Sequence, residues 1–517
     1  MQPMTIVADA QSGASPFGYP PRRVYSVVGV PPEIQAYALA KYSRSNQGML
    51  ESIQELSAQR AEQFLNTFYF QYGHRSIADL AHLVFGLEQI SILAAMAVVD
   101  EPVWDGQERS TRYQPFRKTG WHLPTEVAGT SAESTFARTA EALFDGYKRL
   151  ADALLEHLVD AVPRPQDMVE SNYRRTLRAR AFDVARSLLP LATHTSVGQI
   201  VSARVLERQI GRLLGSEYAE VRAIGADLKS ACQEPPAAPL SEGEQPAAAP
   251  TLVRYAEASP FEDQTRQALS EATATLLRDL GEPDRSCQVE LATPLTDPLR
   301  EIAATLLYRH DANGHSFRQI QDLVGGLPQA QVEEVFDLSL RGRTRHDELL
   351  REHRAGYALA FDGLVDLGSF RDLHRHRRCV QVQQPLGWLH AFDRPEDVFS
   401  NGLGPHAALS ALESNLGEMY VDSLLKAEHA AETVRTNSRA PHAAEYLLPL
   451  AYRTRCLFKM DWAEAAYIIE QRTQPQGHFS YRRVAWGMYM ALRERFPKLA
   501  EPIRATDPEG PFDLLRR

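Results

Sequence analysis

The sequence is poor in cysteine, and this limits the compartment and the chemistry that it suggests. The cysteines are Cys232, Cys287, Cys379 and Cys456, and no C-x-x-C pair occurs. Such usage is typical of a reducing compartment and offers no framework of zinc ligands. We therefore predict a protein that holds no metal.

Long apolar segments and an excess of positive charge are also missing. No run of about 18 apolar residues exists, so no membrane span is expected. Residues 1–21 have no apolar core, so they do not predict a signal peptide. The net charge of −10 argues against general binding to nucleic acid. These absences predict a cytoplasmic protein with neither a membrane nor a nucleic-acid partner.

The chain is long enough for two or more domains. It has 517 residues, of which 44% are hydrophobic and 24% charged, a globular composition. A tract rich in proline, alanine and glutamate runs from residue 233 to 250, and such a composition does not build a core. We predict a first domain over 1–232, a linker over 233–254 and a second domain over 255–517.

Most of the chain has the apolar spacing of helices. Helices are expected over residues 32–70, 74–101, 133–161, 167–189, 197–214 and 357–370. Residues 104–113 are expected to form an ordered loop, and the best strand candidates are 25–30 and 378–383. Ser76 and Asp79 have the spacing of a capping box. We predict a helix-dominated α+β fold.

The second part of the chain looks like a distant repeat of the first. The string A-R-S-L-L-P-L at 185–191 matches A-E-Y-L-L-P-L at 444–450, and a threonine follows each at the same distance, as Thr195 and Thr454. One shared apolar string can arise by chance. The matched order of helices around the linker nevertheless predicts a duplication.

A basic run, H-R-H-R-R at 374–378, ends one of the predicted helices. A buried helix that ends in several cations needs an anion nearby, because unpaired charges are costly to desolvate. Guanidinium groups bind phosphate through paired donors, so a phosphate site is one interpretation. The other is a solvated basic helix end that complements the helix dipole.

Together these motifs resemble the flavin-dependent thymidylate synthase family, whose pattern is R-H-R-x-x-S-x-N-E-x-S-x-R-Y. In that family a histidine-headed helix H-x-[ST]-x-x-[ED] precedes the pattern, and A-R-x-x-L-P and a further arginine follow it. The first part keeps H-R-S-I-A-D at 74–79 and Q-E-R-S-T-R-Y at 107–113, but it has D-E-P at 100–102 in place of R-H-R. It also keeps Arg186 before L-P.

The second part keeps what the first has lost. It has the R-H-R motif as Arg375, His376 and Arg377. It also has Arg472 at the register of the downstream arginine, where the first part has Leu213. It lacks the tail of the pattern at 382–388, and Glu445 replaces the arginine before L-P.

The resemblance implies a composite site. In the family, the R-H-R of one subunit faces the S-x-R-Y of another. Two fused copies can therefore specialise, so that Ser110, Thr111 and Arg112 of the first pair with the R-H-R of the second. The opposite pairing, of 100–102 with 385–387, would be inactive. A homodimer that forms a pseudo-tetramer is expected.

The resemblance also implies roles for individual residues. Binding of FAD is assigned to His74, Ser76, Gln107, Glu108, Ser202, Arg204, Arg375, His376 and Arg377. Binding of the nucleotide is assigned to Ser110, Thr111, Arg112, Arg186 and Arg472, of which Arg186 and Arg472 are also the catalytic candidates. Ser202 and Arg204 stand where the family has N-x-R. Each of these residues also has an alternative that involves no ligand. The alternatives are N-capping for Ser76, a surface turn for His74, surface ion pairs for Glu108, Arg109 and Arg112, and helix-surface positions for Arg186 and Arg472.

Three functional hypotheses remain open. The first is methylation of dUMP to dTMP with methylenetetrahydrofolate and NADPH, which needs no enzyme nucleophile; no cysteine lies in the P-C-H setting of the other thymidylate synthase class. The second is a flavin-binding relative that acts on another pyrimidine nucleotide. Asp105, Gln107 and Asp372 favour it, because the family has serine, asparagine and glutamine there. The third is a degenerate homologue without catalysis.

Overall fold

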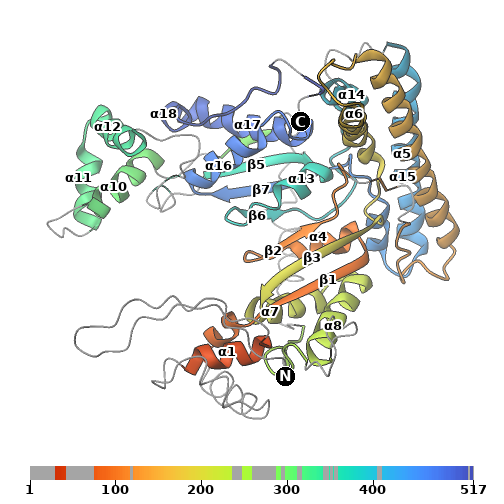
Figure 1. Ribbon diagram of the computed structural model, residues 1–517, viewed down its shortest axis with the longest axis horizontal. Helices are drawn as coiled ribbons and strands as arrows, with labels where there is room; N and C mark the ends of the chain where they lie inside the picture. Colours follow the sequence, from red (N-terminus) through yellow and green to blue (C-terminus); the bar gives the residue numbers. More distant parts are fainter. Residues whose placement is uncertain are drawn as a thin grey trace, which may run out of the picture. The chain divides into compact units, whose positions relative to one another are not determined.

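A computed structural model describes two compact units of the protein (Figure 1). The described residues are 30–41, 75–113, 115–116, 120–235, 247–254, 256–258, 287–292, 297–310, 317–341, 349, 353, 359–403, 410–510 and 513–515. Unit 1 comprises Met1–Leu87, Val103–Gln107 and Gly198–Ala274. Unit 2 comprises Glu88–Pro102, Glu108–Val197 and Thr275–Arg517. Unit 2 therefore contains parts of both halves of the sequence.

In the described residues of unit 1, the helices are α1 (Pro32–Lys41), the 3₁₀ helix η2 (Arg75–Leu80), α7 (Ala203–Leu214) and α8 (Ala219–Gln233). The predicted linker ends in a packed segment here, because Leu252 and Val253 are fully buried. The buried Glu33 carboxylate accepts the backbone N–H groups of Thr251 and Leu252, each over 2.8 Å. The remainder of the predicted helix 32–70 lies outside the described residues, and the predicted domain boundaries stay a prediction.

A three-stranded sheet has the order β1 (His82–Ser91), β3 (His194–Ser202), β2 (Asp105–Glu108). The helix α4 (Ile92–Val99) follows β1, and the Ser91 hydroxyl caps it by accepting the Ala94 N–H over 2.9 Å. The helix predicted over 74–101 is therefore wrong across β1 and correct across α4, and the helix predicted over 197–214 is wrong across the end of β3. The loop predicted over 104–113 contains β2. Of the two strand candidates, 25–29 lie outside the described residues.

Unit 2 contains a four-stranded antiparallel sheet of order β4 (Val289–Leu291), β5 (Leu359–Asp366), β7 (Arg453–Met460), β6 (Val380–Gln383). Phe361 of β5 pairs with Phe458 of β7, and Val382 of β6 pairs with Leu457. The strand predicted at 378–383 is confirmed as β6. The helix predicted over 357–370 is wrong, because β5 occupies most of it and α13 (Leu367–Leu373) begins only after Asp366.

Helices cover this sheet and form the core with it. They include α16 (Trp462–Arg472) and α17 (Phe479–Arg495), which follow β7. Ile469 and Val484 are fully buried in the same core cluster as Phe361. The remaining helices of this region are α10 (Pro298–His310), α11 (Phe317–Gly326), α12 (Gln329–Leu340) and α18 (Pro497–Ala500).

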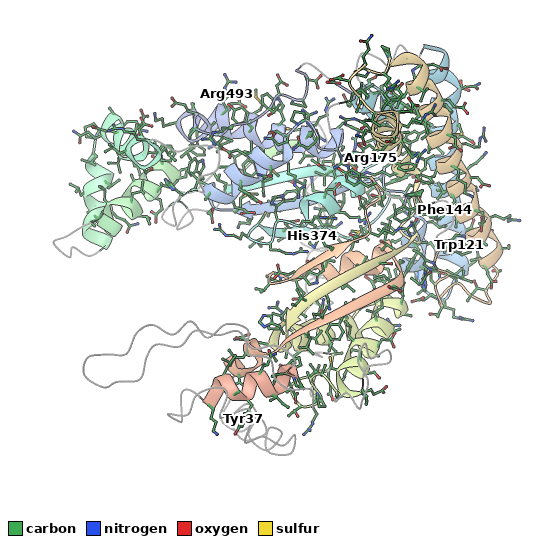
Figure 2. The ribbon with its side chains drawn as sticks, viewed as in Figure 1. Tyr37, Trp121, Phe144, Arg175, His374 and Arg493 are labelled. Carbon is green, nitrogen blue, oxygen red and sulfur yellow. The ribbon has the colours of Figure 1, made fainter. Side chains whose placement is uncertain are left out.

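Long helices form a second part of unit 2, where α5 (Glu133–Ala161) packs between α6 (Glu170–Ala185) and α15 (Ser410–Asn437) (Figure 1). The prediction of a helix over 133–161 is confirmed. Phe144 and Tyr147 belong to its buried stripe (Figure 2). The neighbouring elements are the 3₁₀ helices η3 (Arg186–Leu188) and η6 (Pro441–Leu447) and the helix α14 (Pro395–Leu403).

The two copies of the repeated string pair with each other. The Leu191 N–H donates to the Leu448 carbonyl over 2.8 Å, and the Leu450 N–H donates to the Leu189 carbonyl over 3.0 Å. These bonds exchange equivalent positions, as expected of a local two-fold axis. The element order also repeats, since β5, α13, β6, β7 and α16 follow the order of β1, α4, β2, β3 and α7. The duplication and the helix-dominated α+β class are thus confirmed.

None of the helices in the described part of the chain has both the length and the apolar character needed to cross a membrane.

Candidate functional site

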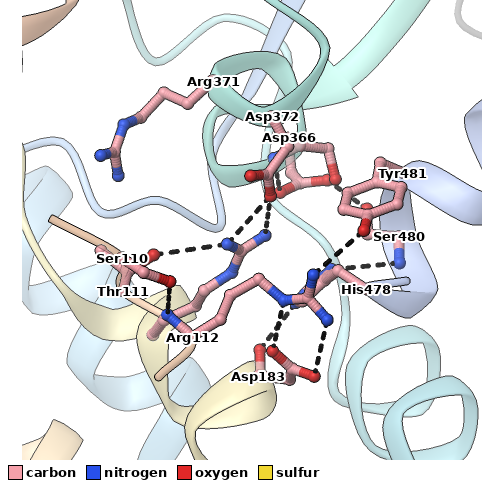
Figure 3. Close-up of polar contacts among 12 residues, drawn as sticks. Ser110, Thr111, Arg112, Asp183, Asp366, Arg371, Asp372, His478, Ser480 and Tyr481 are labelled. Carbon is pink, nitrogen blue, oxygen red and sulfur yellow. Dashed lines mark hydrogen bonds and ion pairs between the residues drawn. The ribbon is translucent and has the colours of Figure 1, made fainter. Parts of the chain in front are cut away.

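The candidate site lies in unit 2, where segments of the two copies meet. The first copy provides the turn after β2, with Ser110, Thr111 and Arg112, and also α6 and η3, which carry Asp183 and Arg186. The second copy provides α13 and the first turn of α17 (Figure 3). Side chains of the two copies therefore form hydrogen bonds to each other inside one compact unit.

The Arg112 guanidinium is buried and its donors are largely occupied. Its Nε and Nη2 donate to the two carboxylate oxygens of Asp183 over 2.9 and 3.4 Å. Its Nη1 donates to the Tyr481 hydroxyl over 3.0 Å, and its Nη2 to the Gln476 carbonyl over 3.1 Å. Burial alone would lower the pKa of Arg112, but Asp183 and Tyr481 shift it upward. This planar, paired arrangement holds Arg112 charged and in one orientation.

Arg186 is also buried and is neutralised by Asp372 of the other copy. Both Nη groups donate to Oδ2 of Asp372 over 3.1 Å, and Nη1 donates to the Thr111 hydroxyl over 3.4 Å. Burial would raise the pKa of Asp372, but Arg186 and Arg112 lower it to about 2, so this carboxyl stays ionised. Gly368 leaves room for the pair, because a Cβ there would lie 3.3 Å from Nη2 of Arg186.

The first turn of α17 adds a buried imidazole and a hydroxyl. His478 Nε2 donates to the Asp183 carbonyl over 2.8 Å, while Nδ1 accepts the Ser480 N–H over 3.2 Å. Burial lowers the pKa of His478 well below its ordinary value, which agrees with this neutral tautomer. The Ser480 hydroxyl donates to Asp366, whose other oxygen caps α13 over 2.8 Å.

The residues of the R-H-R motif have different environments. Arg375 is exposed and has no hydrogen bond or ion pair to any described residue. Arg377 donates through Nη1 to a backbone carbonyl of its own turn over 2.6 Å. His376 is buried and accepts at Nε2 from Nε of Arg472 over 2.8 Å. Within the motif, the Arg375 guanidinium is therefore exposed to solvent, whereas the His376 imidazole is buried.

A further ion pair joins the copies. Glu108, at the end of β2, accepts from Nη2 of Arg371 on α13, and their side chains are 11% and 9% exposed. The Nε of Arg371 is buried without an acceptor among the described residues. Because a buried donor without an acceptor costs free energy, Arg371 is suited to a ligand that provides one.

Other predicted cofactor residues lie in unit 1. Ser202 caps the first turn of α7, where its Oγ accepts a backbone N–H over 3.3 Å. Arg204 is half exposed and pairs with Asp79 over 2.8 Å. The side chain of Gln107 is exposed. Outside the described part of the chain lie His74 and the side chain of Ser76.

Sequence reasoning missed the residues that neutralise and position the cations of unit 2. Asp183 and Tyr481 hold Arg112, and the other missed residues of this region are Arg371, Glu464 and His478. Asp183 had a weak local signal, since it lies three positions before Arg186, which begins η3 directly after α6. Its bond partner, however, is Arg112, which is 71 positions away in the sequence.

Comparison with known proteins finds one family in both halves of the chain. The family model described as thymidylate synthase complementing protein matches residues 29–234 and again residues 301–498. A UPF0159 protein of Chlamydia muridarum is 26% identical over 521 residues, which cover 94% of this chain and 92% of that protein. A UPF0159 protein of Thermoplasma acidophilum is 26% identical over 511 residues, covering 92% and 96%. A flavin-dependent thymidylate synthase of Geobacter sulfurreducens is 26% identical over 201 residues, covering 38% and 75%.

Proposed function

We propose that this chain, which belongs to the thymidylate synthase complementing protein family, is a flavin-dependent enzyme that methylates dUMP to dTMP. Methylenetetrahydrofolate and NADPH would be its co-substrates. The observation that carries the proposal is the meeting of the two copies in unit 2. There, Thr111, Arg112 and Arg186 of the first copy contact Asp372 and Tyr481 of the second.

The cations of unit 2 fit the diphosphate of FAD. Among the described residues, Arg375 is exposed without an ion-pair partner, and the buried Nε of Arg371 has no acceptor. Guanidinium donors of this kind suit a diphosphate, so Arg371, Arg375 and the adjacent Arg377 would hold FAD. When bound, the reduced flavin supplies hydride and mediates methylene transfer. Glu108, of the same unit, belongs to this proposal, while the roles of His74, Ser76, Gln107, Ser202 and Arg204, which belong to unit 1, stay predictions.

Arg472 is the residue best suited to the phosphate of the nucleotide. Arg112 and Arg186 already donate to carboxylates, whereas the two Nη groups of Arg472 have no hydrogen bond to a described residue. Arg112 and Arg186, with Ser110 and Thr111, would then form a fixed part of the site beside the nucleotide. A site built in this way acts by positioning and electrostatics, and it needs no protein nucleophile.

Asp372 favours a second candidate, a flavin-binding relative that acts on another pyrimidine nucleotide. Its carboxylate stays ionised beside Arg186 and offers only hydrogen-bond acceptors. A uracil ring has one donor, N3–H, between two carbonyl acceptors, whereas an amino-substituted pyrimidine also has an exocyclic amino donor for such a residue. This candidate takes the same cofactor and differs only in the base.

Growth of a thymidine-requiring strain tests the proposal. Expression of the chain should permit growth without thymidine, and Arg375→Ala or Arg472→Ala should abolish it. Arg493→Ala is the matched control, because this arginine is exposed on α17 (Figure 2). A yellow protein that fails to support growth would favour the second candidate. A colourless protein that cannot take up FAD would contradict both.

A further inference from the structure

Glu464, His376 and Arg472 form a chain of side chains that ends in a guanidinium. Glu464 and Arg472 both lie on α16, and His376 comes from the turn after α13. Glu464 is 5% exposed and His376 is 7% exposed. Two elements of the second copy thus build a buried polar connection toward the candidate site.

The hydrogen bond between Arg472 and His376 fixes one form of the imidazole. An arginine Nε always carries a hydrogen, so Nε2 of His376, 2.8 Å from Nε of Arg472, has to accept. An imidazolium has no acceptor, and the imidazole is therefore neutral with its proton on Nδ1. That nitrogen faces Oε1 of Glu464 at 3.6 Å. Burial also lowers the pKa of His376, although Glu464 opposes the shift.

Arg472, the last of these three side chains, is held in place, but its charge is not neutralised. The Arg472 guanidinium lies over the ring of Tyr481, with its carbon 5.4 Å from the ring centroid. Tyr481 is itself held through its hydroxyl by Arg112. No carboxylate of a described residue forms an ion pair with Arg472, unlike Arg112 and Arg186. Its Nη donors are thus oriented and available.

We propose that Glu464 and His376 are positioning residues, which hold Arg472 in the orientation that binds the phosphate group of the nucleotide. This rests on the proposed function, which supplies a nucleoside monophosphate as the ligand. His376 supplies the acceptor that fixes Nε of Arg472, and Glu464 fixes the proton of His376 on the opposite nitrogen. A carboxylate that fixes the tautomer and orientation of a histidine in this way is familiar from metal sites, where its loss costs about 10–100-fold in affinity.

The affinities of dUMP and deoxyuridine, which differ by the phosphate alone, isolate the role of Arg472. Calorimetry should show that the wild-type protein binds dUMP more tightly than deoxyuridine. Glu464→Leu should reduce this difference about tenfold, the size of one charge-assisted hydrogen bond, and leave deoxyuridine affinity unchanged. Glu464→Gln, which keeps an acceptor for Nδ1–H, should restore most of it. An equal loss in both variants would mean that only the charge of Glu464 matters and would overturn the inference.

Two further variants control for folding and charge. Arg472→Lys keeps the positive charge but cannot reproduce the Nε–H contact, so it should lose most of the preference for dUMP. Full retention of the preference would contradict the inference even if Glu464→Leu fails to fold. Glu494→Leu, at an exposed position of α17, removes a carboxylate that is not part of the group of Glu464, His376 and Arg472. It should change the affinity of neither dUMP nor deoxyuridine.

Nitrogen chemical shifts of His376, assigned with His376→Gln, test the positioning chain without any nucleotide. The wild-type protein should show the Nδ1–H tautomer, and Glu464→Leu a mixture; an Nε2–H tautomer or an imidazolium in the wild type would overturn the inference. If neither dUMP nor deoxyuridine binds, the proposed function fails, and inorganic phosphate becomes the probe. If the wild-type protein binds phosphate and Arg472→Ala and Glu464→Leu do not, the inference is still supported. If the wild-type protein does not bind phosphate, the inference is contradicted.

Discussion

Arg112 and Arg186 lie in the interior, and each meets a carboxylate at hydrogen-bond distance. Asp183 binds Arg112 through both oxygens, and Asp372 binds Arg186 through one. A buried ion pair contributes little net stability compared with a well-packed apolar pair, but the loss of one partner leaves an uncompensated charge in the interior. These carboxylates are therefore needed for the fold as much as for any ligand.

Replacement of Asp183 by alanine should destabilise unit 2 strongly. It leaves the Arg112 guanidinium buried without its partner, which typically costs about 3–5 kcal/mol. The midpoint of chemical denaturation should fall accordingly. Asp422→Ala, which breaks an exposed pair with Lys426, should cost about 0–1 kcal/mol. Similar midpoints for the two variants would show that Arg112 is not an uncompensated buried cation.

Acid should destabilise the protein through His478. Burial lowers the pKa of this imidazole, whereas the unfolded chain keeps a value of about 6.5. The unfolded state therefore binds the proton first, so the stability that neutral His478 contributes is complete above about pH 6.5 and is lost as the pH falls below it. Thermal melting should show a smaller loss between pH 7 and 5 for His478→Gln than for the wild type. Parallel curves would contradict this assignment.

The residues of the site could be predicted only in part. Arg186, Arg472 and the R-H-R motif were found because they match a pattern that is local in sequence. The partners of the cations were not, because Arg186 and Asp372 are 186 positions apart and come from different copies. No local spacing indicates which carboxylate will neutralise which arginine, since that depends on how the copies pack.

At the level of elements, β1 and β5 have apolar patterns that predict helices for a physical reason. Leu83, Leu87 and Ile90 are buried in β1 at helix-like spacing. Gln89 has a positive φ of 58°, which interrupts the two-residue alternation of the strand between Leu87 and Ile90. In β5, the last four residues are all buried, so burial does not alternate along this end of the strand as it does along a strand with one exposed face.

Two glycines of the three-stranded sheet should respond differently to alanine. A Cβ at Gly106 of β2 would lie 2.3 Å from the Gly198 carbonyl oxygen, so the backbone has to shift. Gly106→Ala should destabilise the protein by about 1–3 kcal/mol, the usual cost of overpacking. Gly86→Ala in β1 meets nothing within 4 Å and should be neutral or slightly stabilising. Equal melting temperatures for both variants would contradict the close approach of β2 to β3.

On the scale of the whole chain, the duplication explains why each half keeps only part of the pattern. The first copy keeps the turn with Arg112, and the second keeps the R-H-R motif, and both contribute to unit 2. Once two copies share one chain, a residue lost from one copy can be supplied by the other. The strings that pair around Pro190 and Pro449 connect the copies by backbone bonds.

The chain should also dimerise, because the family resemblance implies four copies in one assembly. Light scattering should give twice the mass of the 57.9 kDa chain. A stable monomer that still binds FAD would show that two copies are enough for the composite site.

The central claim is that one composite site binds both flavin and nucleotide. A visible absorbance spectrum of the protein reconstituted with FAD tests it most directly, first alone, then with NADPH under anaerobic conditions, then with dUMP. We expect a flavin spectrum that bleaches with NADPH and changes again with dUMP. A flavin spectrum indifferent to dUMP would indicate another substrate. A colourless protein that cannot be reconstituted would contradict the claim, because the fused copies would then have kept the fold without the site.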